Sequence, residues 1–189
     1  MNRMHTSRTA SQPIVIGLAE TDWKEKIDRM EKWLETTSLV QASFHKMVND
    51  AAEAVTEPHI RNALEKMAER AERHDREIGE LFRLIGRERA ALPQAAGPVM
   101  GKMLELAGHS LDMLGGASGT WRYLHELTLA NDHVLGAVAV TEQLALSLGM
   151  KEPVKLTFPL IHEKQTDRLV LMEYMLETAP LSILYDRTV

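Results

Sequence analysis

Four long segments of this chain repeat apolar residues at steps of three and four, the spacing of a helix that buries one side. They cover roughly residues 22–55, 58–85, 121–148 and 153–178. No useful length of the sequence alternates polar and apolar residues as a half-buried strand does. The pattern therefore predicts an all-α fold, in which four amphipathic helices form an antiparallel four-helix bundle.

Residues that start and stop helices divide these segments. Asp22 followed by Glu25 is a capping-box pattern and predicts the start of the first helix. Pro58 is tolerated in a first turn and predicts the start of the second. Gly86 and Gly149 each follow the last apolar residue of a segment, where glycine closes a helix in a left-handed turn.

The second and third helices are joined by a long connection. Within it, residues 99–114 predict a short extra helix before a glycine-rich break. Pro159 lies early in the fourth segment, which predicts either bent first turns or a later helix start. We expect residues 1–20 to form a flexible tail, 21–180 the bundle and 181–189 a C-terminal tail.

The amino-acid composition and net charge of the chain argue against several classes of function. The 189 residues include no cysteine, which excludes disulfides, thiolate metal sites and thiol catalysis. The net charge is −5 with both signs interleaved, which argues against nucleic-acid and anionic-membrane partners. No apolar run approaches the ~20 residues that span a bilayer. We expect a cytoplasmic protein.

Polar residues interrupt the apolar spacing near the middle of each segment. Because residues at equal heights meet in a bundle, these side chains are expected to form one layer. In chain order they are Thr37, Gln41, His45, His74, Glu77, Asn131, Asp132, His133, Glu142, His162, Glu163, Gln165 and Asp167. Carboxylates with imidazoles suit iron, manganese or zinc. Two other interpretations remain open: His74 as a hydrogen-bonded core residue, and Glu77 as part of a solvated face with local ion pairs.

Several stretches resemble the ferritin-like superfamily, and within it the bacterial stress-associated YciE/YciF-type proteins. The best match has His74 and Glu77 three residues apart, followed by a helix end at 81–86. The segments 100–105, 148–149 and 160–167 are also similar in kind and order. The resemblance implies a four-helix bundle with an extra helix in the long connection, a homodimer and a di-metal site.

Some positions of the family's di-metal site hold other residues in this chain. The carboxylate positions fall at Thr37, Asn131 and His162. The candidate metal ligands are therefore His74, Glu77, His162 and Glu163, which either match the family's ligand positions or offer ligand atoms near them. Asp167 is a further acidic candidate. Two metals bring roughly +4 of charge, which needs inward carboxylates in a low-dielectric core.

Three hypotheses follow for function. The first is a ferritin-like bundle with a degenerate di-metal site and a stress-associated or binding role, without the usual ferroxidase chemistry. The alternative is a metal-binding oxidoreductase of the same fold that uses altered His and Glu ligands with iron, manganese or zinc. A hydrolase or transferase built on histidines ranks last, because the chain has no His-x-x-x-His pair. The sequence leaves open whether the protein is an enzyme and which small molecule or protein it binds.

Overall fold

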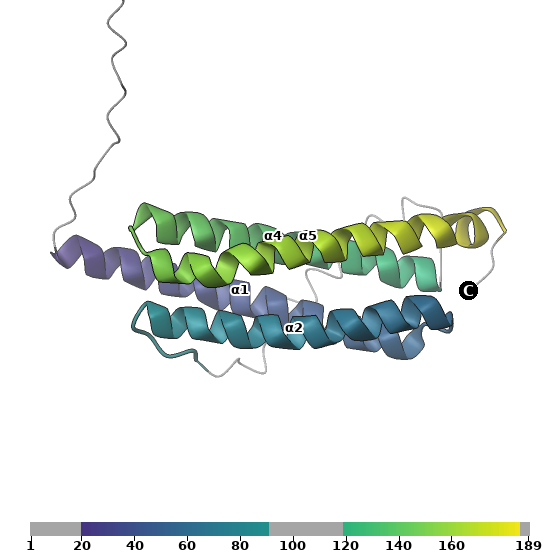
Figure 1. Ribbon diagram of the computed structural model, residues 1–189, viewed down its shortest axis with the longest axis horizontal. Helices are drawn as coiled ribbons and strands as arrows, with labels where there is room; N and C mark the ends of the chain where they lie inside the picture. The colour runs from purple at the N-terminus through teal and green to yellow at the C-terminus, as the bar shows by residue number, and fades with distance from the viewer. Residues whose placement is uncertain (1–19, 91–118, 186–189) are drawn as a thin grey trace, which may run out of the picture.

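A computed structural model of the chain describes residues 20–90 and 119–185 and confirms the predicted all-α four-helix bundle (Figure 1). Its helices are α1 (Glu20–Ala54), α2 (Pro58–Leu84), α4 (Thr120–Ser147) and α5 (Lys151–Ala179), and a π-helical turn, η1 (Pro180–Leu184), follows α5. The described ranges contain no strand. None of the helices in them is long and apolar enough to cross a membrane. The tail predicted before residue 20 and the short helix predicted at 99–114 lie outside the described residues.

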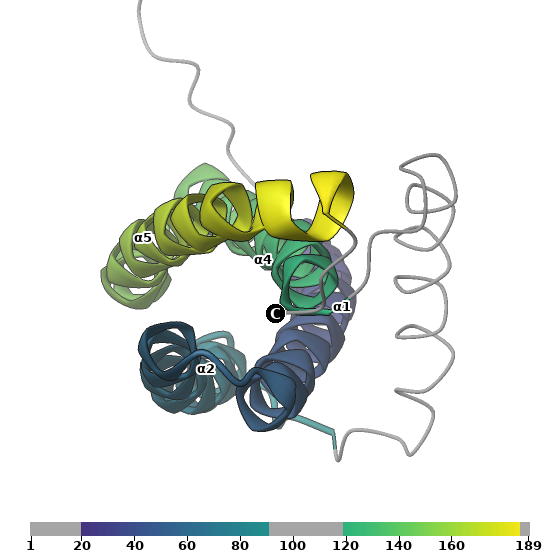
Figure 2. The ribbon, with the colours of Figure 1, turned by 90° about the vertical axis from the view of Figure 1, so that its right-hand side faces the viewer.

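Each helix packs against two neighbours, and neighbouring helices run antiparallel. α1 contacts α2 and α4, and α5 contacts α4 and α2, which closes the ring seen end-on in Figure 2. Arg87, just after α2, bonds Asp28 of α1 at one end of the bundle, with 2.6 Å between Nη2 and Oδ1. Thr120, at the start of α4, donates to Glu57 at the other end over 3.0 Å. The connection between α2 and α4 therefore has its two ends at opposite ends of the bundle.

The predicted glycine stops are confirmed, whereas the predicted start of the first helix is wrong. Gly86 and Gly149 have φ of 70° and 71°, which glycine adopts without strain. α1 begins at Glu20, so Asp22 lies inside the first turn instead of capping it. An acidic residue there still favours the positive end of the helix dipole, which is why the sequence pattern resembles a cap.

α5 runs without a break through Pro159. It begins at Lys151, slightly before the predicted start, and Pro153 occupies its first turn, where no backbone donor is needed. Pro159 cannot donate to the carbonyl of Lys155 one turn earlier. Both residues are exposed, so water can bond that carbonyl and the helix continues.

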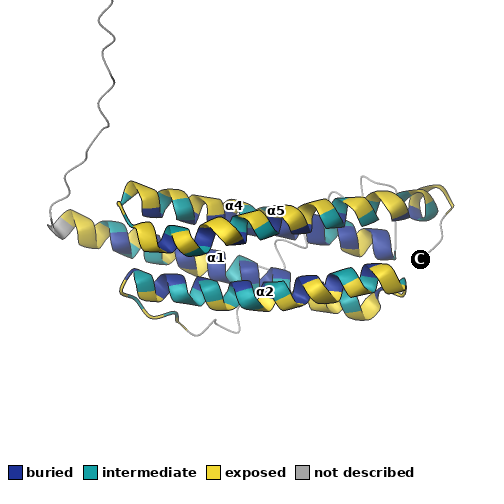
Figure 3. Cartoon of the chain, in the orientation of Figure 1, coloured by how far each residue is buried: buried dark blue, intermediate teal, exposed yellow. Residues whose placement is uncertain are grey.

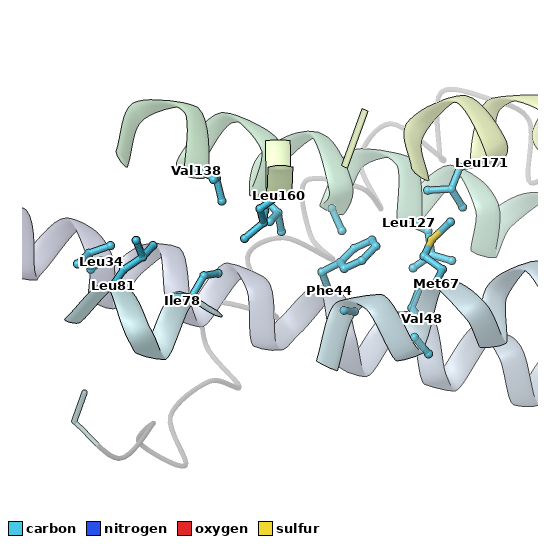
Figure 4. Close-up of a cluster of buried hydrophobic side chains, with 14 of the residues drawn as sticks. Leu34, Phe44, Val48, Met67, Ile78, Leu81, Leu127, Val138, Leu160 and Leu171 are labelled. Atoms are coloured by element: carbon cyan, nitrogen blue, oxygen red, sulfur yellow. The ribbon is translucent and has the colours of Figure 1, made fainter. Parts of the chain in front are cut away.

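The core consists of apolar side chains that the four helices turn inward (Figure 3). The close-up in Figure 4 shows two groups of these side chains along the bundle, with Phe44 between them. One group contains Leu34, Ile78, Leu81 and Val138, and the other contains Val48, Met67, Leu127 and Leu171. The space between them is where the polar side chains lie.

Candidate functional site

The middle of the bundle holds a layer of fully buried polar side chains contributed by all four helices. We call this the central layer; it consists of Thr37, Gln41, His74, Asn131, Lys164 and Asp167. Burial of a charged or amide group is rare unless it is paired. The prediction that polar residues meet in one inward layer is thus confirmed for five of these positions.

Lys164 brings a positive charge into the core. Its side chain is fully buried, and its Nζ lies 3.5 Å from the centroid of the Phe44 ring on α1, a cation–π contact. Nζ has no hydrogen-bond partner among the described residues. Burial lowers the pKa of Lys164 to about 7, helped by the charge of Arg70 and opposed by that of Asp167.

Asp167 supplies a buried negative charge one turn after Lys164. Its Oδ1 accepts two hydrogen bonds from Arg70 of α2, at 3.0 Å from Nε and 2.6 Å from Nη2. Its Oδ2 is buried without a partner in the described part of the chain. Burial raises the pKa of Asp167, while the charges of Lys164 and Arg70 oppose that rise. The layer therefore contains a carboxylate with a cation on either side.

His74 of α2 is held by Glu163 of α5, with 2.7 Å between Nε2 and Oε2. Burial and the charge of Lys164 together lower the pKa of His74 to about 4, against the opposing effect of Glu163. The ring is therefore neutral at pH 7, and its proton is on Nε2, because that nitrogen faces a carboxylate. Nδ1 then carries a lone pair, and it is buried with no hydrogen-bond partner in residues 20–90 or 119–185.

Two amides tie the layer to the helix backbones. Gln41 donates from Nε2 to the carbonyl of Ala71 over 2.8 Å, and Asn131 donates from Nδ2 to the carbonyl of Lys164 over 2.9 Å. Oε1 of Gln41 and Oδ1 of Asn131 are buried and unpartnered within the described ranges. Each unsatisfied buried polar atom costs about 1–3 kcal/mol. A concentration of them in one layer is typical of a site with a role beyond packing.

The structure brings three of the four predicted metal ligands into one neighbourhood. Arg73 bonds Glu163, and its Nε lies 3.8 Å from Oε1 of Glu77. Burial raises the pKa of Glu77, and the negative charge of Glu163 contributes to the rise. His162 is exposed. Within the described residues, no group of three or more His, Asp or Glu side chains is placed to hold a metal ion; the ligand set stays a prediction.

The expectation that other mid-helix polar residues join the layer is wrong. Gln165, His133 and His162 are exposed, and His45 is half-buried. Asp132 bonds Arg168 over 2.9 Å, and Glu142 accepts from Thr157 over 2.9 Å. The physical reason is the rotation of about 100° per residue in a helix, so residues adjacent in sequence point to different sides.

Lys164 is the residue that sequence reasoning missed. A signal for it exists, because Leu160, Lys164, Asp167 and Leu171 follow one another at steps of four, three and four. That spacing is the inward stripe of α5. Lysine is among the residues least often buried, so the pattern alone favours a solvated position.

The chain matches no protein-family model and no curated protein. Several solved structures share its fold. YcfI from Rhodopseudomonas palustris is 14% identical with a TM-score of 0.62, and the match covers 82% of this chain and 97% of that one. A protein from Xanthomonas campestris is 11% identical with a TM-score of 0.68, covering 87% and 99%. Dps from Thermosynechococcus elongatus is 13% identical with a TM-score of 0.63, covering 81% and 94%.

At these identities the matches establish the fold and nothing finer. The expected closeness to YciE/YciF-type proteins stays a prediction. The chain has a ferritin-like four-helix bundle fold.

Proposed function

We propose that this protein is a ferritin-like bundle in which the Lys164 ammonium takes the place of a metal pair at the centre. Its role is then binding or stress-associated, without the usual ferroxidase chemistry. The observation that carries the proposal is the position of Nζ, buried against Phe44 within a layer shared by all four helices. Because its pKa is about 7, Lys164 is protonated below that pH and then supplies there the positive charge that metals supply in other bundles of this fold.

The charges around the layer support the proposal. A metal pair needs inward carboxylates to compensate roughly +4 of charge. Here α1 and α4 contribute the neutral Gln41 and Asn131. Arg70 already bonds Asp167, and Arg73 already bonds Glu163. A metal pair would have to displace both guanidinium groups and remain beside Lys164, so these residues do not fit it.

The test is the metal content of the full-length protein, purified without a metal-affinity tag from cells supplied with iron, manganese and zinc. We expect no stoichiometric metal and the same melting temperature with and without each ion. Oxidation of added Fe(II), followed by the absorbance of the ferric product, is expected to be no faster than in buffer. One or two tightly held ions per chain, lost in Glu163→Gln, would overturn the proposal.

A second candidate is a single metal ion held by His74, Glu77 and Glu163, with His162 as a fourth ligand. The observation in its favour is the contact between Nε2 of His74 and Oε2 of Glu163 at 2.7 Å, with Glu77 beside the same Arg73 that bonds Glu163. Three or four N and O ligands suffice for iron, manganese or zinc. Exposed His162 would have to turn inward. Loss of metal in Glu77→Gln, with none lost in His133→Gln, would select this candidate.

We further propose a homodimer that works in the cytoplasm without a nucleic-acid partner. The net charge of −5 supports the absence of a nucleic-acid surface. Exposed apolar side chains on α5 support self-association, among them Phe158, Leu169 and Leu176. Sedimentation of the full-length chain at several concentrations tests the oligomeric state.

A further inference from the structure

α5 carries an apolar stripe on the side that faces away from the core. We call it the outer stripe; it consists of Phe158, His162, Gln165, Leu169, Met172, Leu176 and Ala179 of α5 and continues into η1 with Ile183. Four of its members are among the most exposed large apolar side chains described: Phe158 at 68%, Leu169 at 67%, Leu176 at 64% and Ile183 at 51%. Figure 3 shows exposed residues along this outward side of α5.

The spacing of the outer stripe is that of a helix packed on another helix. Its steps alternate between four and three from Phe158 to Ile183, which is the heptad pattern of a coiled-coil seam. The stripe extends for ~38 Å at 1.5 Å per residue. None of its eight positions is Asp, Glu, Lys or Arg, although these make up 26% of the chain. An ordinary solvated helix face would carry charges at several of them.

Charges beside the stripe are turned toward neighbouring helices of the same chain. Arg168 bonds Asp132 of α4 at 2.9 Å, and Glu177 lies 3.0 Å from His59 of α2. Glu163, on the α2 side, bonds His74. An approaching helix therefore meets an apolar strip whose flanking charges are largely compensated, and little desolvation cost opposes its docking.

The area of the stripe suits a second copy of this chain. The four most exposed side chains present on the order of 500 Å² on each copy. Two copies would then bury about 1,000 Å², which is the lower size of a specific interface. A self-complementary seam also satisfies a two-fold axis, under which each copy offers the same surface.

We propose that α5 pairs with α5 of a second copy, parallel and in register along the outer stripe. This inference rests on the homodimer proposed above and assigns the surface through which the two copies associate. In this register Gln165 meets Gln165 of the partner subunit, so the two amides can bond each other within the seam.

Charge complementarity favours the parallel orientation. Arg168 directly precedes one stripe position, and Glu173 directly follows another, five residues later. In a parallel pair these flanks face each other, so the half-exposed Arg168 can turn from Asp132 to the partner's Glu173, twice by symmetry. In an antiparallel pair Arg168 would face the flank that holds Met175, and the ion pairs would be lost.

The first test is sedimentation equilibrium of the full chain and of Leu169→Glu/Leu176→Glu. We expect a dimer for the wild type and at least a hundredfold weaker association for the variant, with unchanged helical circular dichroism because both sites are exposed. Leu146→Glu is the matched control, since Leu146 is 50% exposed on α4 outside the stripe. A wild-type monomer would overturn the homodimer and the interface together. A variant that stays dimeric would overturn the interface alone.

The second test concerns orientation. The chain has no cysteine, so Phe158→Cys and Leu176→Cys each introduce a single thiol. These positions are ~27 Å apart along the helix, and only a parallel in-register pair allows both variants to form disulfide-linked dimers. Arg168→Glu is expected to weaken association about tenfold, and adding Glu173→Arg to restore it. Crosslinking at one position only, or no restoration by the double variant, would contradict the proposed register.

Discussion

The ends of the bundle and its centre are equally buried and chemically opposite. Toward the ends the inward side chains are aliphatic, such as Leu81 at one end and Leu127 at the other. At the centre they are Gln41, His74, Asn131, Lys164 and Asp167. Burial stabilises the first kind by removing apolar area from water, and it destabilises the second by removing hydration from charges and amides. The comparison indicates that the ends stabilise the fold while the centre costs stability.

The largest effect is expected at an end. Leu81→Ala removes a fully buried side chain that apolar neighbours surround, and is expected to lower the free energy of unfolding by about 2–5 kcal/mol. Urea denaturation followed by circular dichroism measures it. Leu146→Ala, at a half-exposed position on α4, is the control and should change stability little. A loss below about 1 kcal/mol for Leu81→Ala would show that the ends do not dominate stability.

The next largest effect is expected when the pH is lowered, because His74 in the central layer then titrates differently in the folded and unfolded states. Between pH 6.5 and about 4 the unfolded state protonates His74 and the folded state does not, because burial lowers the folded pKa to about 4. Stability therefore falls as pH falls through this window, by about 3 kcal/mol in total. We expect His74→Gln to lose this component of the pH dependence, while His133→Gln, at an exposed position, keeps it.

Comparing variants separates the contribution of the His74–Glu163 pair from those of Glu77 and Asp167. Burial raises the pKa of both Glu77 and Asp167, so the folded state takes up their protons first and is favoured as pH falls. These contributions are shared by the wild type and His74→Gln and cancel in the difference, which then measures His74 together with Glu163, whose pKa the bond to His74 lowers. Identical pH profiles for the two proteins would contradict a buried neutral histidine.

The apolar ends were predictable from the sequence, and so was the fold. The steps of three and four identify one buried side of α2, where Ile60, Leu64, Met67, Ile78 and Leu81 are all buried. α5 was harder, because apolar residues lie on its inward side and along the outer stripe. A helix with two apolar sides has no single period that reveals which one faces the core.

The central layer was only partly predictable. Gln41, His74 and Asn131 stand out because a polar residue replaces an apolar one in a regular stripe. Lys164 was missed because its preference for solvent outweighs its place in the stripe. The bonds from Arg73 to Glu163 and from Arg70 to Asp167 join helices about 90 residues apart in sequence, with separations of 90 and 97. Local spacing contains no information on such pairs.

A smaller effect, of opposite sign, is expected from Lys164→Met. Nζ makes no hydrogen bond that the variant would lose within the described part of the bundle. An apolar side chain of similar length avoids the cost of the buried charge, so the variant is expected to gain about 1–3 kcal/mol at pH 7. Chemical denaturation measures the gain, and Lys155→Met, at an exposed position on the same helix, is the control. A loss of stability would show that Lys164 holds the layer together.

The gain from Lys164→Met is expected to shrink, and then to become a loss, as pH rises from 7 to 10. In this window the unfolded state keeps the lysine proton and the folded state does not, because the folded pKa is about 7. The wild type is therefore stabilised by about 1.4 kcal/mol per pH unit, and the variant is not. A gain that stays constant with pH would mean that Lys164 is not held in a low-dielectric site.

The smallest effect is expected from the ion pair between Arg168 and Asp132, which lies on the outside of the bundle near the central layer. Arg168 follows Lys164 by four residues, and Asp132 follows Asn131 directly, yet Arg168 and Asp132 are about half exposed at 48% and 41%. Water screens their attraction, and ordering two side chains offsets it further, so Asp132→Asn is expected to change stability by less than about 0.5 kcal/mol. Thermal melts at low and high salt measure this change. A larger loss would mean that this ion pair helps to fix α4 against α5, and that exposure alone does not separate the outside of the bundle from its centre.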